Sequence, residues 1–553
     1  MKKRRGLSFV LSGLLIVSFL LSACSQSTST SQQPPSSSSS TQTDAAKSAP
    51  QQVLKINARA EPTSLDPALV DERTAGDMAN QLFEGLVRVN KNNEVVPGVA
   101  EKWDISSDNT VYTFYIRKDA KWSNGDQVTA EDFAYSWERA LRPETAAPLS
   151  DNLSFIKNGS KYLKGEIKDP KQLGIKVKDP LTLEITLERP TPFFLRLTSF
   201  FSVLPVNKKV DQSNPKWAGE ASTFVSNGPF MLKDWKHDQE IVMVPNPNYW
   251  AKDVVKLQQL EWKMVNDQNT EYQMFQTGEL DVAYPPTSVT GKLLAEGKAK
   301  LAPQARTLYV RYNLTVSPFT NEKIRKAFAY AIDRKTLADK VTQGGEIPAT
   351  GLIPAGLSSG NGDFRTLAGQ DLFTDNNVEE AKKLLAEGLQ ELNLTALPKL
   401  TFLTNNLDIR LKISQALQEM WKRNLGVEVE VKSMEQKAWI QSVRTGDYQF
   451  AIYSTGADYD DAFNLFGQYT TGDVYNYSKY SNPEYDKLVE AAFNETDLAK
   501  RAQNMVDAEK ILIDDMAINP LQYGNIPYLE NDQVKNVFRF AVSAMDFREA
   551  YKE

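Results

Sequence analysis

The spacing of apolar residues predicts both strands and helices along the chain. Apolar and polar side chains alternate through residues 111–116 (VYTFYI) and again through 181–187, and this two-residue period is typical of β-strands with one buried face. Apolar residues follow the helical period after Thr129, a residue type that favours the position before a helix, and again through 324–332. The chain is therefore predicted to be a mixed α/β protein.

The stretch from 398 to 462 carries the most informative pattern. We expect a strand at 400–402, a helix at 409–421, a strand at 427–431, a short helix at 437–444 and a strand at 448–453. Gly426 suits the residue after the first helix, because glycine readily adopts the left-handed conformation that ends many helices. Strands that alternate with helices run parallel and are joined by helical crossovers. The stretch is therefore predicted to be a parallel sheet unit.

Two charged residues are expected at one edge of this unit. In open α/β sheets, ligands bind beyond the carboxyl ends of the strands. Arg410 follows the first predicted strand and Asp458 follows the third. Each is a candidate for ligand binding, and on this argument alone each could equally be a solvated loop charge or a helix-end charge.

The N-terminus predicts export. Basic residues at 2–5 precede an apolar run from Leu7 to Leu21, and the single cysteine of the chain, Cys24, follows Leu21-Ser22-Ala23. This tail resembles a bacterial lipobox, which implies cleavage before Cys24 and a lipid anchor of two acyl chains on its sulfur. The alternatives are a transmembrane anchor, for which the run is short, or an ordinary signal peptide. We expect a signal peptide at 1–23 and a protein anchored on the extracytoplasmic side of the cell membrane of a single-membrane bacterium.

Composition narrows the remaining possibilities. Residues 24–50 consist mostly of Ser, Thr, Gln and Pro, so we expect a disordered tether there. About 500 residues follow, enough for two or three domains. The formal net charge is −6 and becomes more negative once the basic signal is removed. Such an acidic protein is not expected to bind nucleic acid.

The scarcity of cysteine and histidine excludes several classes of enzyme. With Cys24 assigned to the signal there is no thiol nucleophile and no thiolate metal site, and the single histidine, His237, lies in a polar turn expected at 233–238. Residues 356–360 (GLSSG) match the G-x-S-x-G pattern of serine hydrolases, but they are expected in a loop, whereas the motif requires a strand before it and a helix after it. We predict no enzymatic activity, no cofactor and no metal.

Several motifs, taken in order, resemble one known family. They are 82–86 (LFEGL), 96–103 (VPGVAEKW), 114–137 (FYIRKDAKWSNGDQVTAEDFAYSW), 227–230 (NGPF), 246–250 (NPNYW) and 318–325 (PFTNEKIR). Together they resemble the family 5 extracellular solute-binding proteins of ABC importers, and the oligopeptide-binding branch above all. The resemblance covers nearly all of 52–545.

This resemblance implies a periplasmic-binding-protein-like α/β fold of cluster C, type II, with two lobes, an extra inserted domain and a cleft that closes about a hinge. The implied domains are domain I at 51–84, 208–306 and 524–553, domain II (the insert) at 85–207 and domain III at 307–523.

The resemblance also implies a function and a site. The implied function is a monomeric, non-enzymatic receptor that binds oligopeptides and delivers them to an ABC permease, holding the peptide backbone as an added strand. Asp458, in the matching segment 457–459, would pair with the peptide α-ammonium, and Arg410 would neutralise its carboxylate, which a guanidinium binds bidentately. The expected ligand-binding residues are Asp71, Arg73, Asn405, Arg410, Gln436, Ser454, Thr455, Gly456, Ala457, Asp458 and Tyr459.

The chain also departs from the family pattern. Thr455 and Gln436 stand where a relative has tryptophan, Gly456 where it has cysteine, and Leu149 about where it has tyrosine. The pocket walls are therefore less aromatic, and no side-chain preference is implied. Other functions stay open: capture of a nickel chelate, haem, cell-wall peptide or oligosaccharide by the same fold, a peptide-signal receptor or surface chaperone, and a secreted hydrolase, which the single histidine disfavours.

Overall fold

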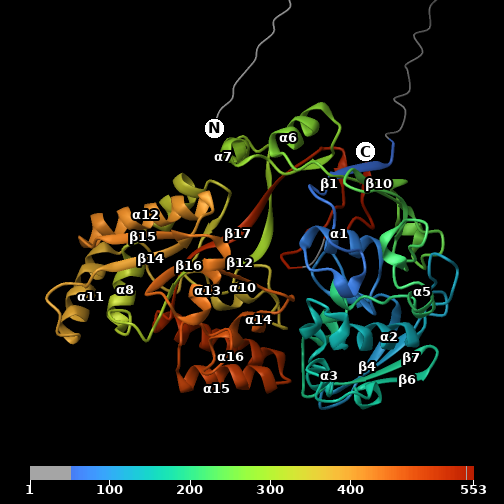
Figure 1. Ribbon diagram of the computed structural model, residues 1–553, viewed down its shortest axis with the longest axis horizontal. Coiled ribbons are helices and arrows are strands. Elements are labelled where there is room, and N and C mark those ends of the chain that lie inside the picture. Colours follow the sequence, from blue (N-terminus) through green and yellow to red (C-terminus); the bar gives the residue numbers. More distant parts are fainter. Residues whose placement is uncertain (1–50, 543–544) are drawn as a thin grey trace, which may run out of the picture. The chain divides into compact units, whose positions relative to one another are not determined.

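The computed structural model describes residues 51–542 and 545–553. Within them, an eleven-stranded sheet has the order β15-β14-β16-β12-β17-β11-β1-β10-β9-β8, with β13 paired to β17 beside this path (Figure 1). Its strands are β1 Val53–Asn57, β8 Phe230–Lys236, β9 Glu240–Pro245, β10 Gln259–Lys263, β11 Val282–Ala283, β12 Lys300–Tyr312, β13 Ile347–Pro348, β14 Leu400–Asn405, β15 Val429–Met434, β16 Phe450–Gly456 and β17 Ile518–Glu530. Segments from both ends of the chain thus share one sheet.

The two longest strands, β12 and β17, join the halves of this sheet. At one end β17 pairs with β11, and at the other β12 pairs with β16. Between these ends the β12–β17 register shifts between Pro303 and Thr307. Irregular pairing of this kind locally bends a sheet. Residues 304–306 therefore lie at an irregular part of the strand pair that joins the two halves of this sheet.

The predicted β-α-β-α-β unit is confirmed. Strand β14 pairs in parallel with both β15 and β16. Its helices are α12, Asp408–Leu425, which ends at Gly426 with φ of 70°, and α13, Gln436–Thr445. Phe402 faces a core with α12, whereas its neighbour Leu403 faces Trp439 of α13. Both faces of the sheet are therefore covered, as in most parallel sheets.

A separate four-stranded sheet lies within 100–186. It consists of β4 Ala100–Ile105, β5 Val111–Ile116, β7 Thr182–Thr186 and β6 Ile175–Asp179, in that order. Helix α2, Ala130–Leu141, packs Phe133 and Trp137 into the core, and the Thr129 amide donates to the Asp132 carboxylate over 2.9 Å. These strands and this helix confirm the predictions from residue spacing. The remaining strands of the described residues form two sheets of two strands each. One pairs β2 Val87–Val89 with β3 Val95–Pro97, and the other pairs β18 Val534–Lys535 with β19 Tyr551–Lys552.

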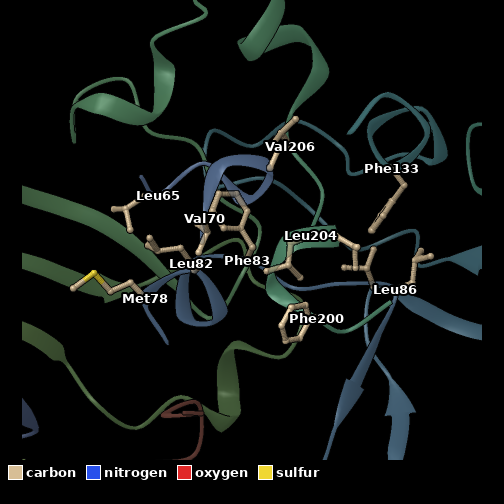
Figure 2. Packing of buried hydrophobic residues seen from close by; sticks show 14 of the residues in the cluster. Leu65, Val70, Met78, Leu82, Phe83, Leu86, Phe133, Phe200, Leu204 and Val206 are labelled. Atoms are coloured by element: carbon tan, nitrogen blue, oxygen red, sulfur yellow. The ribbon is translucent and has the colours of Figure 1, made fainter. Parts of the chain in front are cut away.

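The buried side chains divide into clusters. The largest cluster draws its residues from 54–282 and 534–550, and Figure 2 shows part of it around Leu82, Phe83 and Leu204. The buried hydrophobic residues of 307–523 pack into other clusters. Tyr459 is the exception: among the described residues of that segment, it alone is buried in the largest cluster.

The other helices are α1 Arg73–Leu82, α3 Gly159–Leu163, α4 Phe194–Leu197, α5 Lys208–Ser213, α6 Gln268–Thr277, α7 Thr287–Ala295, α8 Glu322–Tyr330, α9 Arg334–Thr336, α10 Phe364–Ala368, α11 Val378–Glu391, α14 Phe463–Phe466, α15 Pro483–Asn494 and α16 Leu498–Asp514.

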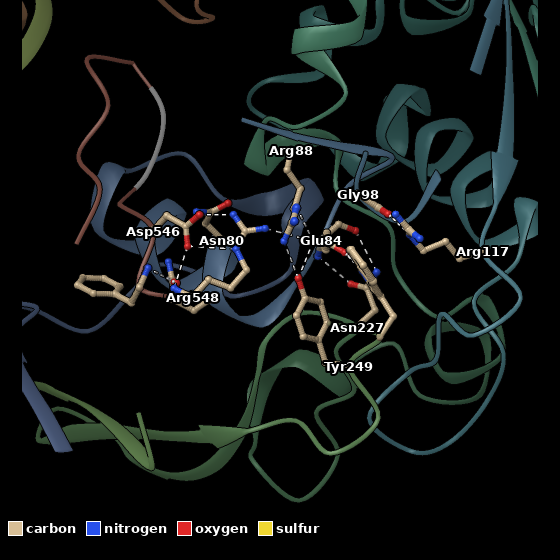
Figure 3. Close-up of polar contacts among 12 residues, drawn as sticks. Asn80, Glu84, Arg88, Gly98, Arg117, Asn227, Tyr249, Asp546 and Arg548 are labelled. Carbon is tan, nitrogen blue, oxygen red and sulfur yellow. Dashed lines mark hydrogen bonds and ion pairs between the residues drawn. The ribbon is translucent and has the colours of Figure 1, made fainter. Parts of the chain in front are cut away.

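A polar junction joins residues 80–88 to residues 546–548 (Figure 3). The Glu84 carboxylate accepts hydrogen bonds from the Tyr249 hydroxyl over 2.7 Å and from the Arg548 guanidinium over 3.3 Å. Its backbone amide and carbonyl bond the side-chain amide of Asn227. Arg548 also pairs with Asp546. The buried charges of this junction are therefore matched by opposite charges or by hydrogen bonds.

The turn expected at 233–238 is shorter than predicted. Residues 233–236 belong to β8, and the turn occupies 237–239. The sequence pattern hides this strand, because β8 pairs with β9 through its backbone while Lys233 and Lys236 are exposed to solvent. His237 lies 2.6 Å from Glu61, whose hydrogen bond raises the pKa of the imidazole.

The GLSSG motif at 356–360 lies outside any helix or strand, as predicted.

Candidate functional site

A cavity of about 240 Å³ lies beside the irregular part of β12. Its lining comes from the start of α1, from β12, from the loop after β16 and from residues 541–542. The lining residues are Asp71, Glu72, Arg73, Leu149, Phe200, Phe201, Gln304, Ala305, Arg306, Gly456, Ala457, Asp458, Ala541 and Val542. Five of the residues predicted from sequence therefore lie together here: Asp71, Arg73, Gly456, Ala457 and Asp458.

A second cavity, of about 170 Å³, adjoins the first and contains Arg410. The two cavities share Gln304 and Arg306. The other lining residues are Leu308, Thr342, Glu346, Ile409, Ile413, Gln522, Tyr523, Gly524 and Asn525. The predicted carboxylate and the predicted guanidinium thus occupy neighbouring cavities along one cleft.

Arg410 is a cation without a matching carboxylate. It lies in the first turn of α12, and its Nη2 donates a 2.9 Å hydrogen bond to the Ser454 hydroxyl. Its Nη1 is buried without a hydrogen-bond partner, and no described carboxylate lies within ion-pair distance. Burial, together with the nearby Arg306, lowers the pKa of Arg410 to about 10. Arg410 therefore stays charged at neutral pH and presents an unsatisfied donor to an anion.

Asp458 is the opposite case, a carboxylate without a matching cation. Its backbone amide donates to the Asn464 side chain over 2.9 Å, and its carboxylate forms no ion pair with any described residue. Asp458 is exposed to the cleft, but partial desolvation by the surrounding protein raises its pKa, the Asn464 hydrogen bond lowers it, and the Asp151 charge raises it further. A cation placed beside Asp458 would stabilise its ionised form.

The remaining predicted residues play different parts. Asn405 donates a 2.6 Å hydrogen bond to Gln436, and its own side-chain oxygen is buried without a partner. The Thr455 hydroxyl accepts a 3.0 Å hydrogen bond from Gln468. Tyr459 stacks on Phe193 with ring centroids 4.6 Å apart, so its ring packs in the core and supports the loop.

Sequence reasoning missed Arg306, which lines both cavities. Arg306 lies opposite Gly456 in the antiparallel pairing of β12 with β16. Its place in the site follows from this pairing, which joins residues 150 positions apart in the chain. The local pattern around Arg306 contains no comparable signal.

The cleft is electrically polarised. The first cavity has three carboxylates, Asp71, Glu72 and Asp458, against two guanidinium groups, and the second has Arg306 and Arg410 against the single carboxylate of Glu346. Ser454, which bonds Arg410, precedes Asp458 by four residues, a span of at most about 13 Å at 3.3 Å per residue of extended chain. This arrangement suits an extended ligand with a positive charge at one end and a negative charge at the other.

The described residues give no support for a metal site or a membrane span. No cluster of three or more His, Cys, Asp or Glu side chains among them is arranged to hold a metal ion. In the same part of the chain, every helix is too short or too polar to cross a bilayer.

Comparisons with known proteins agree on one family. Residues 94–477 match the bacterial extracellular solute-binding proteins, family 5 Middle. The chain is 41% identical to the dipeptide-binding protein DppE of Bacillus subtilis over 92% of this chain and 93% of the relative. The unliganded open form of the murein tripeptide-binding protein MppA has a TM-score of 0.81 at 32% identity, with 91% and 98% of the two chains covered. Listeria monocytogenes OppA bound to peptide has a TM-score of 0.70 at 34% identity, with 91% and 99% covered.

Proposed function

The chain belongs to the family 5 bacterial extracellular solute-binding proteins, and we propose that it captures oligopeptides outside the cytoplasm and delivers them to an ABC permease. The names of its relatives support peptides as the solute, since they include dipeptide-binding and oligopeptide-binding proteins. The proposal assigns the protein a binding role without a chemical step. It requires an ABC permease as partner and treats the receptor as a monomer.

One observation carries the proposal: the Asp458 carboxylate and the buried Arg410 guanidinium lie in neighbouring cavities, and neither forms an ion pair with a described residue. A buried charge without a partner is costly, and one that lines a cleft can be matched by a ligand of opposite charge. The α-ammonium of a peptide matches Asp458, and its carboxylate matches Arg410, which is positioned to bind it through two N–H groups. The backbone between the two ends would add as a strand and confer little sequence preference.

We further propose that the peptide closes the cleft. Strands β12 and β17 connect the two halves of the sheet, and the shifted register at 304–306 provides the bend. The higher TM-score with an unliganded open structure than with a peptide-bound one supports an open arrangement here. Small-angle scattering should show a smaller radius of gyration with saturating tetra-alanine than without it. An unchanged radius would contradict closure.

The domain boundaries are part of this proposal. Domain I would comprise 51–84, 208–306 and 524–553, and domain II would be the insert at 85–207. Their residues share the largest hydrophobic cluster, which supports movement of I and II as one lobe. Apart from Tyr459, the buried hydrophobic residues of domain III, 307–523, lie mainly in other clusters, which supports its movement as the other lobe.

We also propose that the receptor is held on the membrane by a lipid at Cys24. Cys24, the signal peptide at 1–23 and the tether at 24–50 lie outside the described residues. The proposal rests on the sequence around the cysteine. Cys24→Ala should release the protein from membranes while peptide binding stays intact, and cell fractionation measures this. A variant that stays in the membrane fraction would indicate that the apolar run at 7–21 is retained as a span.

The direct test of the solute is mass spectrometry of ligands that co-purify with the native-sequence receptor. Mixed short peptides with free termini are the expected result. A nickel chelate, haem, an oligosaccharide or a cell-wall peptide alone would replace the proposal with another solute of the same fold. A single defined peptide would instead favour a signal receptor.

A further inference from the structure

The loop after β16 carries three carboxylates within four residues, and each has a different environment. Asp461 accepts hydrogen bonds from Arg501 at both oxygens, over 2.7 and 3.0 Å, and both side chains are buried. Asp460 pairs with Arg196 over 2.6 Å, and its other oxygen accepts from the Ser358 amide over 3.0 Å. Asp458 forms no ion pair with the described residues. Two of the three charges are thus neutralised, and one is left for the cleft.

Arg196 reaches this loop from a distant part of the chain. It lies in α4, within the proposed insert domain. The side chain and backbone carbonyl of Asn93 accept hydrogen bonds from its guanidinium over 2.9 and 2.6 Å. Arg196 is therefore already oriented when it meets Asp460, so little side-chain entropy is lost in forming the pair.

Tyr459 anchors the same loop to the insert by packing, next to the Arg196–Asp460 ion pair. Its ring stacks on Phe193, three residues before Arg196, and meets the edge of Phe155 with centroids 6.2 Å apart. The ring thus joins the hydrophobic cluster of the insert rather than the clusters of its own segment. The insert therefore holds both Tyr459 and Asp460, the two residues that directly follow Asp458.

We propose that Arg196 is a positioning residue for the ligand ammonium: by neutralising Asp460 and holding its loop, it leaves Asp458 as the one carboxylate of this loop without an ion pair and fixes its place in the cleft. This inference rests on the proposed function, in which Asp458 binds the peptide amine. Without Arg196, Asp460 would be a buried unpaired carboxylate two residues from Asp458. The loop would then relieve that cost by protonation of Asp460 or by a shift of its backbone. The inserted domain thereby gains a role in ligand selection.

The test compares the affinities of tetra-alanine and Nα-acetyl-tetra-alanine by calorimetry. Their ratio reports the amine interaction and is insensitive to a uniform loss of binding. In Arg196→Gln, the preference of the receptor for the free amine should fall by about tenfold, the middle of the range for directly coupled neighbours. Arg196→Lys should restore part of it. The matched control is Arg189→Gln, because Arg189 also joins the insert to domain III, stacking on Phe493 at 3.4 Å, without touching the loop carboxylates. It should keep the wild-type ratio.

The outcomes separate the two claims. A wild type that binds both peptides equally would overturn the proposed role of Asp458 itself. A wild type that prefers the free amine, with Arg196→Gln keeping the same ratio or weakening both peptides equally, would overturn the positioning role alone. If Arg196→Gln fails to fold, Asp460→Asn tests the same pair, since its amide oxygen can still accept from Ser358. Asp460→Asn removes the ion pair that holds the loop, so it should also lower the ratio, and an unchanged ratio there would overturn the claim that this pair holds Asp458 in place.

Discussion

Two regions of the 307–523 segment treat buried charge in opposite ways. Beneath α16, Arg365 pairs with Glu509 and Arg501 pairs with Asp461, and all four side chains are at most 2% exposed. In the cleft, Arg410 has only the Ser454 hydroxyl as a partner. The difference indicates that the paired arginines serve the fold and that the unpaired one is kept for a ligand.

Arg311 shows that the lack of a carboxylate partner does not by itself mark an arginine as ligand-binding. Arg311 is fully buried and forms no ion pair with the described residues, yet it lines neither of the cleft cavities. Its guanidinium donates to the Tyr309 hydroxyl over 2.5 Å and stacks on Tyr453 at 4.2 Å. Tyrosine rings can stabilise a cation that no carboxylate reaches. Access to a cavity, and not the missing carboxylate alone, therefore distinguishes Arg410.

The largest expected effect is on stability, and it comes from removing one of the paired, buried arginines. Arg501→Met should lower the free energy of unfolding by ~3–5 kcal/mol, because Asp461 is left buried without its partner. Arg410→Met should leave stability unchanged or raise it, because no carboxylate loses a partner. Urea denaturation of both variants measures the contrast. Equal destabilisation would contradict the distinction between the two arginines.

The same Arg410→Met variant should fail in binding. Loss of one member of a desolvated charge pair typically costs ~2–5 kcal/mol, or roughly 30- to several thousand-fold in affinity. Tetra-alanine should show this loss in calorimetry, whereas tetra-alanine amide should bind the variant and the wild type about equally. A variant that binds the free carboxylate as well as the wild type does would remove Arg410 from the site.

The sequence predicted local elements better than long-range pairing. The sheet unit of 398–462 was predictable because its strands and helices alternate within one stretch, and Gly426 marks the end of α12. Arg306 was not, because its place opposite Gly456 depends on the pairing of β12 with β16. The strand at 233–236 was hidden because its solvent-facing side chains are charged. The role of Tyr459 in the core depends on Phe193, which no local pattern connects to it.

Asp77 is a buried carboxylate outside the cleft, and its titration should make the stability of the protein depend on pH. Asp77 in α1 accepts a 2.6 Å hydrogen bond from the Met545 amide, and burial raises its pKa from 3.8 to about 6, although Arg73 opposes the shift. A folded-state pKa above the unfolded one means that the Asp77 contribution to stability is greatest in acid and is lost as pH rises from about 4 to about 6.

Asp77→Asn should remove this dependence, because the amide oxygen can still accept from Met545 and carries no charge. At pH 7 the variant should be more stable than wild type by up to about 3 kcal/mol, at ~1.4 kcal/mol per pKa unit. Urea midpoints from pH 4 to pH 8 measure the difference. Parallel curves for the two proteins would show that Asp77 does not titrate in this range.

A smaller effect is expected in the pH dependence of peptide binding. Partial desolvation and the Asp151 charge raise the pKa of Asp458, so its carboxylate should protonate at a higher pH than an ordinary aspartate. Peptide affinity should fall as pH drops through that raised pKa, by at most about tenfold per pH unit. Asp458→Asn should lack this acidic decline. A wild-type affinity that is constant down to the ordinary aspartate pKa would contradict the assignment.

The most direct test of the central claim is a four-way calorimetric cycle on the Asp458–ammonium pair. It combines wild type and Asp458→Asn with tetra-alanine and its Nα-acetylated form. Asp458→Asn and acetylation should each weaken binding by ~2–5 kcal/mol. Together they should cost little more than either alone, because both remove the same interaction. Fully additive losses, or a wild type indifferent to acetylation, would contradict the claim that the Asp458 carboxylate binds the peptide amine.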